Sequence, residues 1–448
     1  MSCEICEMKN FSQLDLFSMN RLSPGQGGSL NSLQESRSGT FTDNLRLPIH
    51  RWFRYSAGFS SEWVEQSIKD FSGTQRPVVL DPFVGSGTTL LAAEKVGAVV
   101  YGYESHPFVY RIATAKLLWH LDEHHLLKIS RSLLDHARTR KSQNVSGQLP
   151  ELLIKSFTPE TLERLVALRD TYTETCQETE EWQLVWLAIT AILRSCSYVG
   201  TAQWQYVLPN KRKATTLDPF QAFEAKVLEM ASDMAFAKQS GFRQTATVFL
   251  RDAREPAPIA NDTVALVITS PPYPNNYDYA DATRLEMTFW GEVSSWGDLQ
   301  HAVRQFIVRS CSQHAAAERL NLEELLQDAA LGPIHAELTD VCHQLAEIRL
   351  TKGGKKTYHT MIAAYFADMA KVFLRLRSVC RAGAQICFVV GDSAPYGVYV
   401  PADVWLGHLA VAAGFDSFSF EKVRDRNVKW KNRKHRVPLH EGRLWIKG

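Results

Sequence analysis

The pattern of apolar and polar positions predicts a parallel β-sheet whose strands come from two separated parts of the chain. Short apolar runs rich in β-branched residues lie at 78–80, 98–103, 247–250, 264–268 and 386–390. Runs of this length without alternation are typical of strands buried on both faces. In a parallel sheet, the polar residues that follow such runs gather at the carboxyl edge, where α/β proteins bind ligands. The pattern therefore predicts a doubly wound α/β fold with its site at that edge.

A helical pattern replaces the strand pattern across residues 121–241. Pro159 and Pro219 mark helix starts, because proline is favoured in the first turn of a helix. Apolar residues then recur at helical spacing, most clearly at Trp182, Val185, Trp186, Ile189, Ile192, Leu193 and Cys196. This stretch is predicted to be a helical insertion with a small core of its own.

The predicted organisation is one α/β domain in two parts, interrupted by helices. Residues 1–40 are polar and lack periodicity, which predicts a flexible tail. Residues 41–120 and 242–448 are expected to form the α/β domain, and residues 121–241 the insertion. A second helical stretch is expected at about 280–360 within the second part.

Composition identifies an ordinary globular chain. Its 448 residues are 45% hydrophobic, enough for a sizeable core, and its formal net charge is only +2. The eight cysteines are scattered, which favours reduced thiols over a disulfide framework. The longest apolar stretch stops at Arg194, too short to cross a bilayer, and the N-terminus lacks the residue order of a signal peptide. We therefore expect a cytoplasmic protein without a membrane partner.

Cys3 and Cys6 form a Cys-x-x-Cys pair in the tail. One such pair supplies only half of a tetrahedral zinc site. A cluster of His120, His124 and His125 is one way to complete it, and a solvated helix face is the other interpretation of those histidines. We expect no metal in the functional site.

A glycine-rich turn follows the first predicted strand, in the sequence Asp81-Pro82-Phe83-Val84-Gly85-Ser86-Gly87-Thr88-Thr89. Glycines two apart at a strand-to-helix turn let the backbone approach a ligand. No lysine follows the second glycine, as a P-loop requires, and the third glycine of the dinucleotide fingerprint is absent. A nucleoside without a pyrophosphate fits better. Glu104, at the end of the next strand, is placed to accept from both hydroxyls of a ribose.

Ser270-Pro271-Pro272-Tyr273 follows the apolar run at 264–268. The prolines lack backbone donors and leave carbonyl groups free to accept, while Ser270 adds a hydroxyl and Tyr273 a flat ring. Acceptors beside a stacking surface suit the exocyclic amine of a planar base. Such an amine is a poor nucleophile until acceptors on its N–H groups draw its lone pair out of conjugation. No Pro-Cys dipeptide occurs, which argues against methylation of a ring carbon through a thiolate.

Together the two motifs resemble the paired signature of the amino-methylating DNA methyltransferases, which act on cytosine N4 or adenine N6. The resemblance extends to Glu104, to Asp252 after the third strand and to the aromatic loop at 50–55, and covers most of 50–117 and 242–448. It implies a Rossmann-like class I methyltransferase sheet of seven strands with the last antiparallel. It also implies S-adenosyl-L-methionine as the cofactor.

The resemblance also implies roles for individual residues. Those implied to bind the cofactor are Asp81, Pro82, Phe83, Gly85, Gly87, Thr88, Glu104 and Asp252, with Glu104 on the ribose and Asp252 facing the adenine amine. Those implied to act on a base flipped out of double-stranded DNA are Ser270, Pro271, Pro272 and Tyr273. Serine at the first motif position favours cytosine N4, since Asp or Asn is more frequent there in adenine enzymes; adenine N6 is the alternative. A cognate restriction nuclease is a further partner that one chain cannot identify.

Two other functions stay open at this point. An RNA base methyltransferase could use a similar motif, although the sequence carries no signature of an RNA-binding module. A catalytically silent methyltransferase fold could serve as a DNA-binding subunit, although intact motifs in both halves of the site count against it.

Two basic segments are the main candidates for contact with DNA, and the loop from Lys352 to Lys356 is a further one. The denser one is C-terminal and comprises Lys422, Arg424, Arg426, Lys429, Lys431, Arg433, Lys434 and Arg436. It is expected to track phosphates, with a solvated sheet edge as the alternative. The other, Lys211-Arg212-Lys213, marks the insertion, which is open to a recognition role or to a role as a buttress. In the family's alpha arrangement the recognition region follows the third-strand motif, whereas the insertion precedes Asp252, so 280–360 is a rival for that role.

Overall fold

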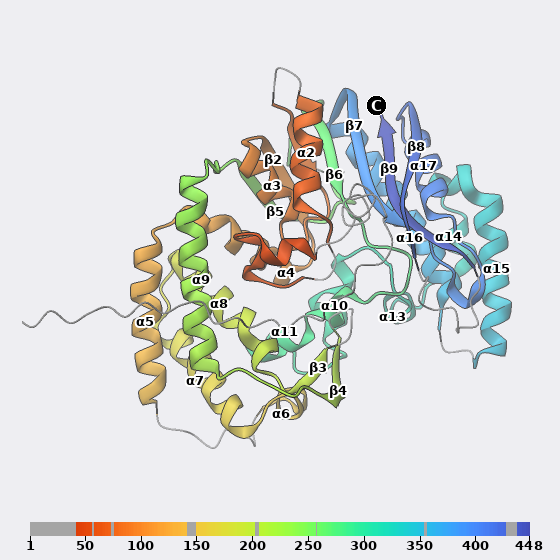
Figure 1. Ribbon diagram of the computed structural model, residues 1–448. Coiled ribbons are helices and arrows are strands. Elements are labelled where there is room, and N and C mark those ends of the chain that lie inside the picture. The colour runs from red at the N-terminus through yellow and green to blue at the C-terminus, as the bar shows by residue number, and fades with distance from the viewer. Residues whose placement is uncertain are drawn as a thin grey trace, which may run out of the picture.

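A seven-stranded, mostly parallel sheet forms the centre of the molecule (Figure 1). The computed structural model describes residues 42–55, 58–72, 76–140, 149–201, 206–256, 258–353, 356–426 and 437–448. In sheet order the strands are β5 (Ala246–Leu250), β2 (Val99–Glu104), β1 (Val78–Asp81), β6 (Val264–Thr269), β7 (Cys380–Gly391), β9 (Leu439–Lys447) and β8 (Ser417–Arg426). Strand β9 is antiparallel to both of its neighbours, and the pairs from β5 to β7 are parallel. The expected Rossmann-like class I methyltransferase sheet is confirmed.

Helices cover both faces of this sheet, which is why its central strands are apolar throughout. Val79 and Leu266 pack on the face covered by α2 (Ser61–Ser72) and α3 (Thr88–Val96). Leu80 and Val267 pack on the opposite face, in one cluster with α16 (Tyr358–Val379). The same face carries α15 (His335–Thr351) and α17 (Ala402–Ala412). Neighbouring residues of one strand thus face different helix layers.

The residues between β2 and β5 form a helical lobe beside the sheet (Figure 1). Its helices are α5 (Glu123–Thr139), α6 (Glu151–Ser156), α7 (Pro159–Thr175), α8 (Glu181–Cys196) and α9 (Pro219–Gln239). The starts predicted at the two prolines are confirmed: Thr158 caps α7, and Asp218 caps α9 by accepting from two backbone N–H groups. A short antiparallel ribbon that the sequence analysis missed joins α8 to α9. It consists of β3 (Val199–Thr201) and β4 (Val207–Arg212).

The core of this lobe is larger than expected and is not its own. The lobe's buried residues form one cluster with Phe108 of α4 (Pro107–Leu117) and Met287 of α11 (Arg284–Trp290). Trp52, from the aromatic loop before β1, belongs to the same cluster. The prediction of a separate small core was therefore wrong, because amphipathic spacing shows that a helix has an apolar face but not which neighbour covers it.

Short helices fill the chain between β6 and α15. They are α10 (Tyr279–Ala282), α12 (Leu299–Ala302), α13 (Ser312–Ala317) and α14 (Leu322–Leu326), with 3-10 turns at Arg304–Phe306 and Ala329–Ile334. Other 3-10 turns span Asp43–Arg46, His50–Trp52, Leu118–His120 and Pro395–Gly397. In Figure 1 the segment from α10 to α13 lies between the helical lobe and the α14–α17 side of the sheet.

Candidate active site

The two sequence motifs meet at the carboxyl edge of the sheet. Strands β1 and β6 are neighbours, so the turn after Asp81 and the motif after Thr269 emerge side by side. The Thr269 hydroxyl donates to the Asp81 carboxylate over 2.6 Å, across 188 residues of chain. Burial raises the pKa of Asp81 to about 6, against the opposing effect of this hydrogen bond. The strand order, rather than nearness in sequence, brings the motifs together.

The glycine-rich turn has the backbone geometry that its sequence predicts. Gly85 and Gly87 adopt φ values of 53° and 94°, in the left-handed region that favours glycine. The Phe83 amide donates to Asp81 over 3.0 Å, and Gly87 precedes the first residue of α3. Pro82 and Thr88 are buried on either side of the turn.

Glu104 closes this turn from the end of β2. One carboxylate oxygen accepts from the Gly85 amide and the other from the His106 amide, each over 2.8 Å. A carboxylate offers about two acceptor positions per oxygen. One position on each oxygen therefore remains, which fits the two hydroxyls of a ribose. Burial raises the pKa of Glu104 to about 7, while the two backbone hydrogen bonds oppose that rise.

Ser270 is held as a hydrogen-bond acceptor at the end of β6. Its hydroxyl donates to the Val389 carbonyl of β7 over 3.1 Å. Because the single hydroxyl proton is used there, the oxygen can interact with a further group only through its lone pairs. Pro271 is buried and Pro272 half-buried behind it.

The ring of Tyr273 is positioned by residues whose roles the sequence analysis missed. The Arg426 guanidinium lies 5.3 Å from the ring centre. A Cβ atom at Gly391 would lie only 3.2 Å from the ring and 2.5 Å from Arg426, so glycine is needed at the end of β7. Gly391, at the end of β7, is visible in the sequence and could have indicated a close contact at that point. Nothing in the sequence connects Arg426 of β8 with the Tyr273 ring.

Tyrosines line the same edge. Tyr277 and Tyr279 follow the Ser-Pro-Pro-Tyr motif, with ring centres 4.5 Å apart in an edge-to-face arrangement. Burial raises the pKa of both, and also that of Tyr55 from the loop before β1, which the nearby Glu104 raises further. These rings stay neutral at physiological pH and offer flat surfaces suited to an aromatic ligand.

Asp252, beyond the end of β5, is not free to face a ligand with its whole carboxylate. Its two oxygens accept from the backbone N–H, Nε and Nη2 of Arg254 over 2.5 to 3.0 Å. Because the Arg254 Nε–H is shared between both oxygens, each carboxylate oxygen accepts two hydrogen bonds from Arg254. The orientation of the Asp252 carboxylate is therefore set by Arg254.

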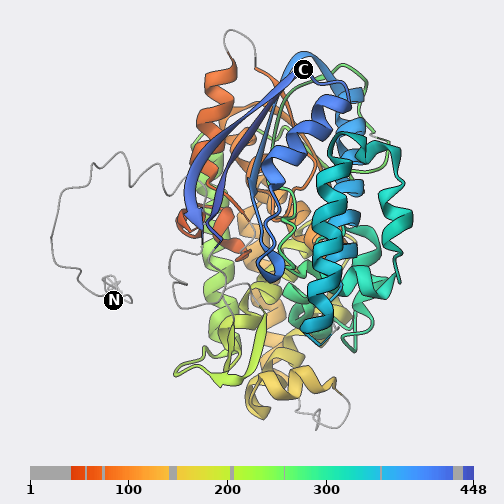
Figure 2. The ribbon, with the colours of Figure 1, turned by 90° about the vertical axis from the view of Figure 1, so that its right-hand side faces the viewer.

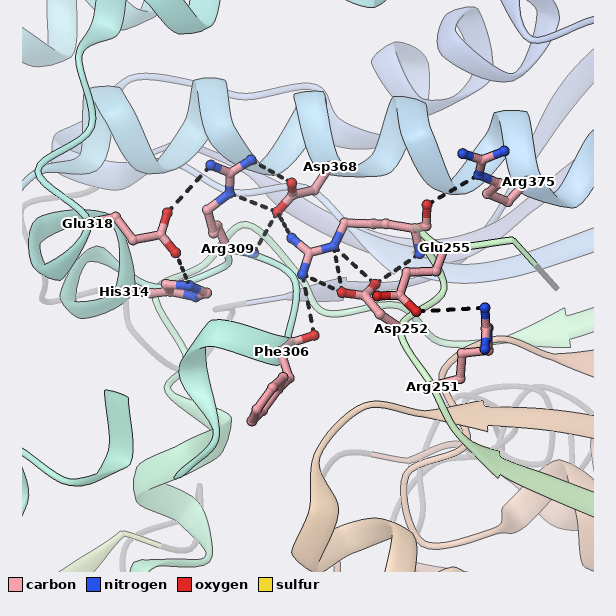
Figure 3. Close-up of polar contacts among 10 residues, drawn as sticks. Arg251, Asp252, Glu255, Phe306, Arg309, His314, Glu318, Asp368 and Arg375 are labelled. Carbon is pink, nitrogen blue, oxygen red and sulfur yellow. Dashed lines mark hydrogen bonds and ion pairs between the residues drawn. The ribbon is translucent and has the colours of Figure 1, made fainter. Parts of the chain in front are cut away.

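Arg254 connects Asp252 to a chain of charged side chains around the buried Asp368 (Figure 3). Its Nη1 lies 2.9 Å from Asp368 of α16, which also accepts from the backbone N–H, Nε and Nη2 of Arg309. The two arginines hold the pKa of Asp368 below its usual value although the side chain is buried. Arg309 then reaches Glu318, which pairs with His314.

The segment containing Arg309 is also joined to the loop after Tyr273. Arg304 donates to Asp278 over 2.6 Å, and the two residues are only 1% and 4% exposed. The Asn276 amide donates to the Ser310 carbonyl over 3.1 Å, and its side-chain oxygen accepts from the Ser312 amide over 2.8 Å. Residues 304–312 thus contact the loop after Tyr273 on one side. On the other side they connect, through Asp368 and Arg254, to Asp252 beyond the end of β5.

Some sequence predictions lie outside the described residues, namely those on the tail at 1–40 with Cys3 and Cys6, and on the basic residues from 427 to 436. His120 contacts the Leu117 carbonyl through Nδ1, as a helix-end residue would. In the part of the chain that the structure describes, no group of three or more His, Cys, Asp or Glu side chains is arranged to hold a metal ion. Within the same residues, no helix has the length and apolar character needed to span a bilayer.

Comparisons with known proteins agree with the two motifs. Residues 15–115 match the model of a family described as DNA methylase, of the N6 and N4 type. The chain is 24% identical to the type II methyltransferase M.BsoBI of Geobacillus stearothermophilus, over 86% of this chain and 82% of that protein. It is 25% identical to the type II methyltransferase M.AvaI of Anabaena variabilis, over 84% and 81%. A shorter stretch of 48 residues is 46% identical to the type II methyltransferase M.HindIII of Haemophilus influenzae, over 11% and 16%. The chain is thus similar to DNA methyltransferases of the amino-methylating type.

Proposed function

We propose that this protein transfers a methyl group from S-adenosyl-L-methionine to the exocyclic amine of a base flipped out of double-stranded DNA. Cytosine N4 is the favoured target atom, and adenine N6 is the alternative. The proposal rests on one observation. The Ser270 hydroxyl donates its proton to the Val389 carbonyl, which leaves the Ser270 oxygen as an acceptor at the point where the two motifs meet. The relatives' designation as type II methyltransferases supports DNA as the substrate and a cognate nuclease as a partner.

The cofactor would lie across the turn between β1 and α3. Its methionine end fits beside Asp81, Pro82, Phe83, Gly85, Gly87 and Thr88, where two glycines let the backbone approach closely. Glu104 has an acceptor position left on each oxygen for the ribose, and Asp252 would face the adenine amine from beyond the end of β5. When bound, the cofactor supplies an electrophilic methyl group on its sulfonium.

The target amine would be activated by acceptors. A base amine shares its lone pair with its ring, and hydrogen bonds accepted from its N–H groups return that pair to the nitrogen. The Ser270 oxygen and the Pro271 carbonyl are the acceptors, and Tyr273 stacks on the base. The base must leave the duplex to reach them, because its amine is otherwise paired inside the helix. No covalent intermediate with the protein is needed.

Mass spectrometry of treated DNA tests this proposal directly. Unmethylated plasmid is incubated with the protein and cofactor carrying an isotope-labelled methyl group, and the DNA is digested to nucleosides. We expect labelled N4-methylcytosine, and less label with the Tyr273→Ala variant at the same time point. Labelled N6-methyladenine alone would overturn the choice of cytosine, and label in added RNA but not in DNA would overturn DNA as the substrate. A wild-type protein that binds the cofactor yet labels neither would refute transferase activity.

A further inference from the structure

The ribbon of β3 and β4 projects from the helical lobe beside the candidate active site. Figure 2 shows it low on the molecule, in yellow-green, pointing to the same side as the lower ends of the dark blue strands β8 and β9. Arg426, whose guanidinium faces Tyr273, ends β8 on that side. The ribbon and the base-binding edge of the sheet therefore share one face of the molecule.

An aromatic contact fixes the base of the ribbon to the loop after Tyr273. Tyr206, directly before β4, has its ring centre 5.5 Å from that of Tyr277. Its hydroxyl oxygen accepts from the Asp278 amide over 2.7 Å. Asp278 is the residue that Arg304 holds through a buried ion pair, so the start of β4 is joined to a firmly held residue of the loop. The ribbon is therefore anchored to the loop that follows Tyr273.

A bulge gives β4 residues that β3 does not pair. Val199 pairs with Arg212, but the next residue, Gly200, pairs with Leu208, so residues 209–211 have no counterpart in the described part of β3. A β-bulge bends its strand and leaves the extra residues unpaired. Gly200 permits it, because a Cβ atom there would lie 2.9 Å from the Lys211 Cβ.

The exposed residues at the bulge form a positively charged surface that, within the described chain, no acidic side chain pairs with. Asn210, Lys211 and Arg212 are exposed, and within the described chain neither Lys211 nor Arg212 forms an ion pair. The Arg212 guanidinium lies 4.9 Å from the ring centre of Tyr198, which limits the orientations open to it. Lys213 differs from these two, since it is half-buried and donates to the Arg194 carbonyl.

We propose that this surface, Asn210 with Lys211 and Arg212, contacts the backbone of the DNA duplex next to the base that is flipped toward Tyr273. The inference rests on the proposed function and assigns the insertion a substrate-binding role. A two-stranded ribbon is narrow enough to follow a major groove, and exposed lysine and arginine bind phosphates. The helical segment at 280–360 is the weaker candidate, because its arginines nearest the loop, Arg284, Arg304 and Arg309, each pair with carboxylates.

Salt-dependent binding of a short mixed-sequence DNA duplex tests the assignment. The double variant Lys211→Ala with Arg212→Ala should bind DNA more weakly, and the slope of log affinity against log salt should fall by up to about 0.9 for each lost phosphate contact. Cofactor affinity should not change. The charge-conserving double variant Lys211→Arg with Arg212→Lys should keep the wild-type slope.

The matched control lies on the far side of the insertion. Lys128 and Arg131 are exposed on α5, remote from the ribbon in Figure 1. Changing both to alanine removes one lysine and one arginine, as the ribbon variant does. The slope of log affinity against log salt should stay unaltered. An unaltered slope in the ribbon variant, with wild-type protein that binds and methylates DNA, would overturn this inference alone. Weakened binding of RNA but not DNA would also overturn it, whereas wild-type protein without DNA methylation would overturn the proposed function itself.

Discussion

The proposed cofactor side and the proposed target-base side of the site are held in place by different interactions. On the cofactor side, backbone amides of the turn itself donate to Asp81 and Glu104. On the target side, the buried ion pair of Arg304 with Asp278 joins residues 26 apart in sequence. The pair of Arg309 with Asp368, 59 residues apart, serves both sides, because Asp368 also holds Arg254 beside Asp252. A third pair, Arg194 with Glu286, joins α8 of the insertion to α11 across 92 residues.

This difference predicts different consequences of mutation. The turn after β1 is held by several hydrogen bonds to two carboxylates, so changing one of these side chains leaves the other in place, and substitutions there should reduce ligand affinity more than stability. A loop held by a buried ion pair depends on both partners, because removing one leaves an uncompensated charge inside the protein. On the target side, substitutions in the ion pairs should therefore lower the stability of the protein. Substitutions of the Tyr273 ring should lower only the rate of methyl transfer.

The largest effect is expected for Arg304→Ala, which leaves the Asp278 carboxylate buried without its cation. Loss of one partner of a buried pair costs about 3–5 kcal/mol. We expect urea unfolding, followed by circular dichroism, to show a loss of this size. The control is Arg164→Ala, which removes an exposed ion pair with Asp218 and should cost less than about 1 kcal/mol. Equal losses in the two variants would contradict the comparison between the two sides.

Glu104→Ala should weaken cofactor binding with little change in stability. The variant removes charge-assisted hydrogen bonds to the ribose worth about 1.5–3 kcal/mol, or roughly 10- to 150-fold in affinity. Gly85→Val should block binding altogether, since valine is strained at the φ of 53° found there. Titration calorimetry with S-adenosyl-L-methionine measures both, and wild-type affinity in the two variants would remove the cofactor from this turn.

Tyr273→Ala should reduce methyl transfer without reducing cofactor affinity. The lost base stacking is worth about 1–3 kcal/mol. Tyr273→Phe keeps the ring beside Arg426 and should retain most of the activity, because the proposed role of the residue lies in its ring. A Tyr273→Ala enzyme that methylates DNA at the wild-type rate would show that the base binds elsewhere.

The sequence was sufficient to predict the cofactor side, because its signals are local. An apolar run, an acidic residue at its end and two glycines describe a complete turn, and the structure forms it at Asp81, Gly85 and Glu104. The parallel sheet followed from the same runs. The Ser-Pro-Pro-Tyr motif was recognisable for the same reason, and its neighbour across the edge, Asp81, follows from the order of the strands.

The target side could not be predicted, because its interactions are not local. The chain has 50 Lys and Arg and 48 Asp and Glu, and nothing in their spacing indicates that Arg304 pairs with Asp278. The β3–β4 ribbon was not predicted because β3 has only three residues. In addition, Gly200 of β3 and Asn210 and Lys211 of β4 belong to residue types that are depleted in strands. Arg426 was read as part of a basic surface, but its guanidinium faces Tyr273.

The smallest predicted effect is a pH dependence of cofactor affinity that arises only on the cofactor side. Burial raises the pKa of Glu104 to about 7 in the free protein, so this carboxyl is partly protonated at neutral pH. Ribose hydroxyls bind the ionised form better, and binding should therefore release protons. Affinity should fall as pH falls below about 7, by up to about tenfold per pH unit, and should level off above it. Asp81, with a pKa of about 6, adds to the loss only at lower pH. Calorimetry from pH 6 to 8 in two buffers of different ionisation enthalpy measures this release. The isosteric Glu104→Gln variant should show almost no pH dependence in that range, and a wild-type affinity that stays constant would mean that Glu104 does not bind the ribose.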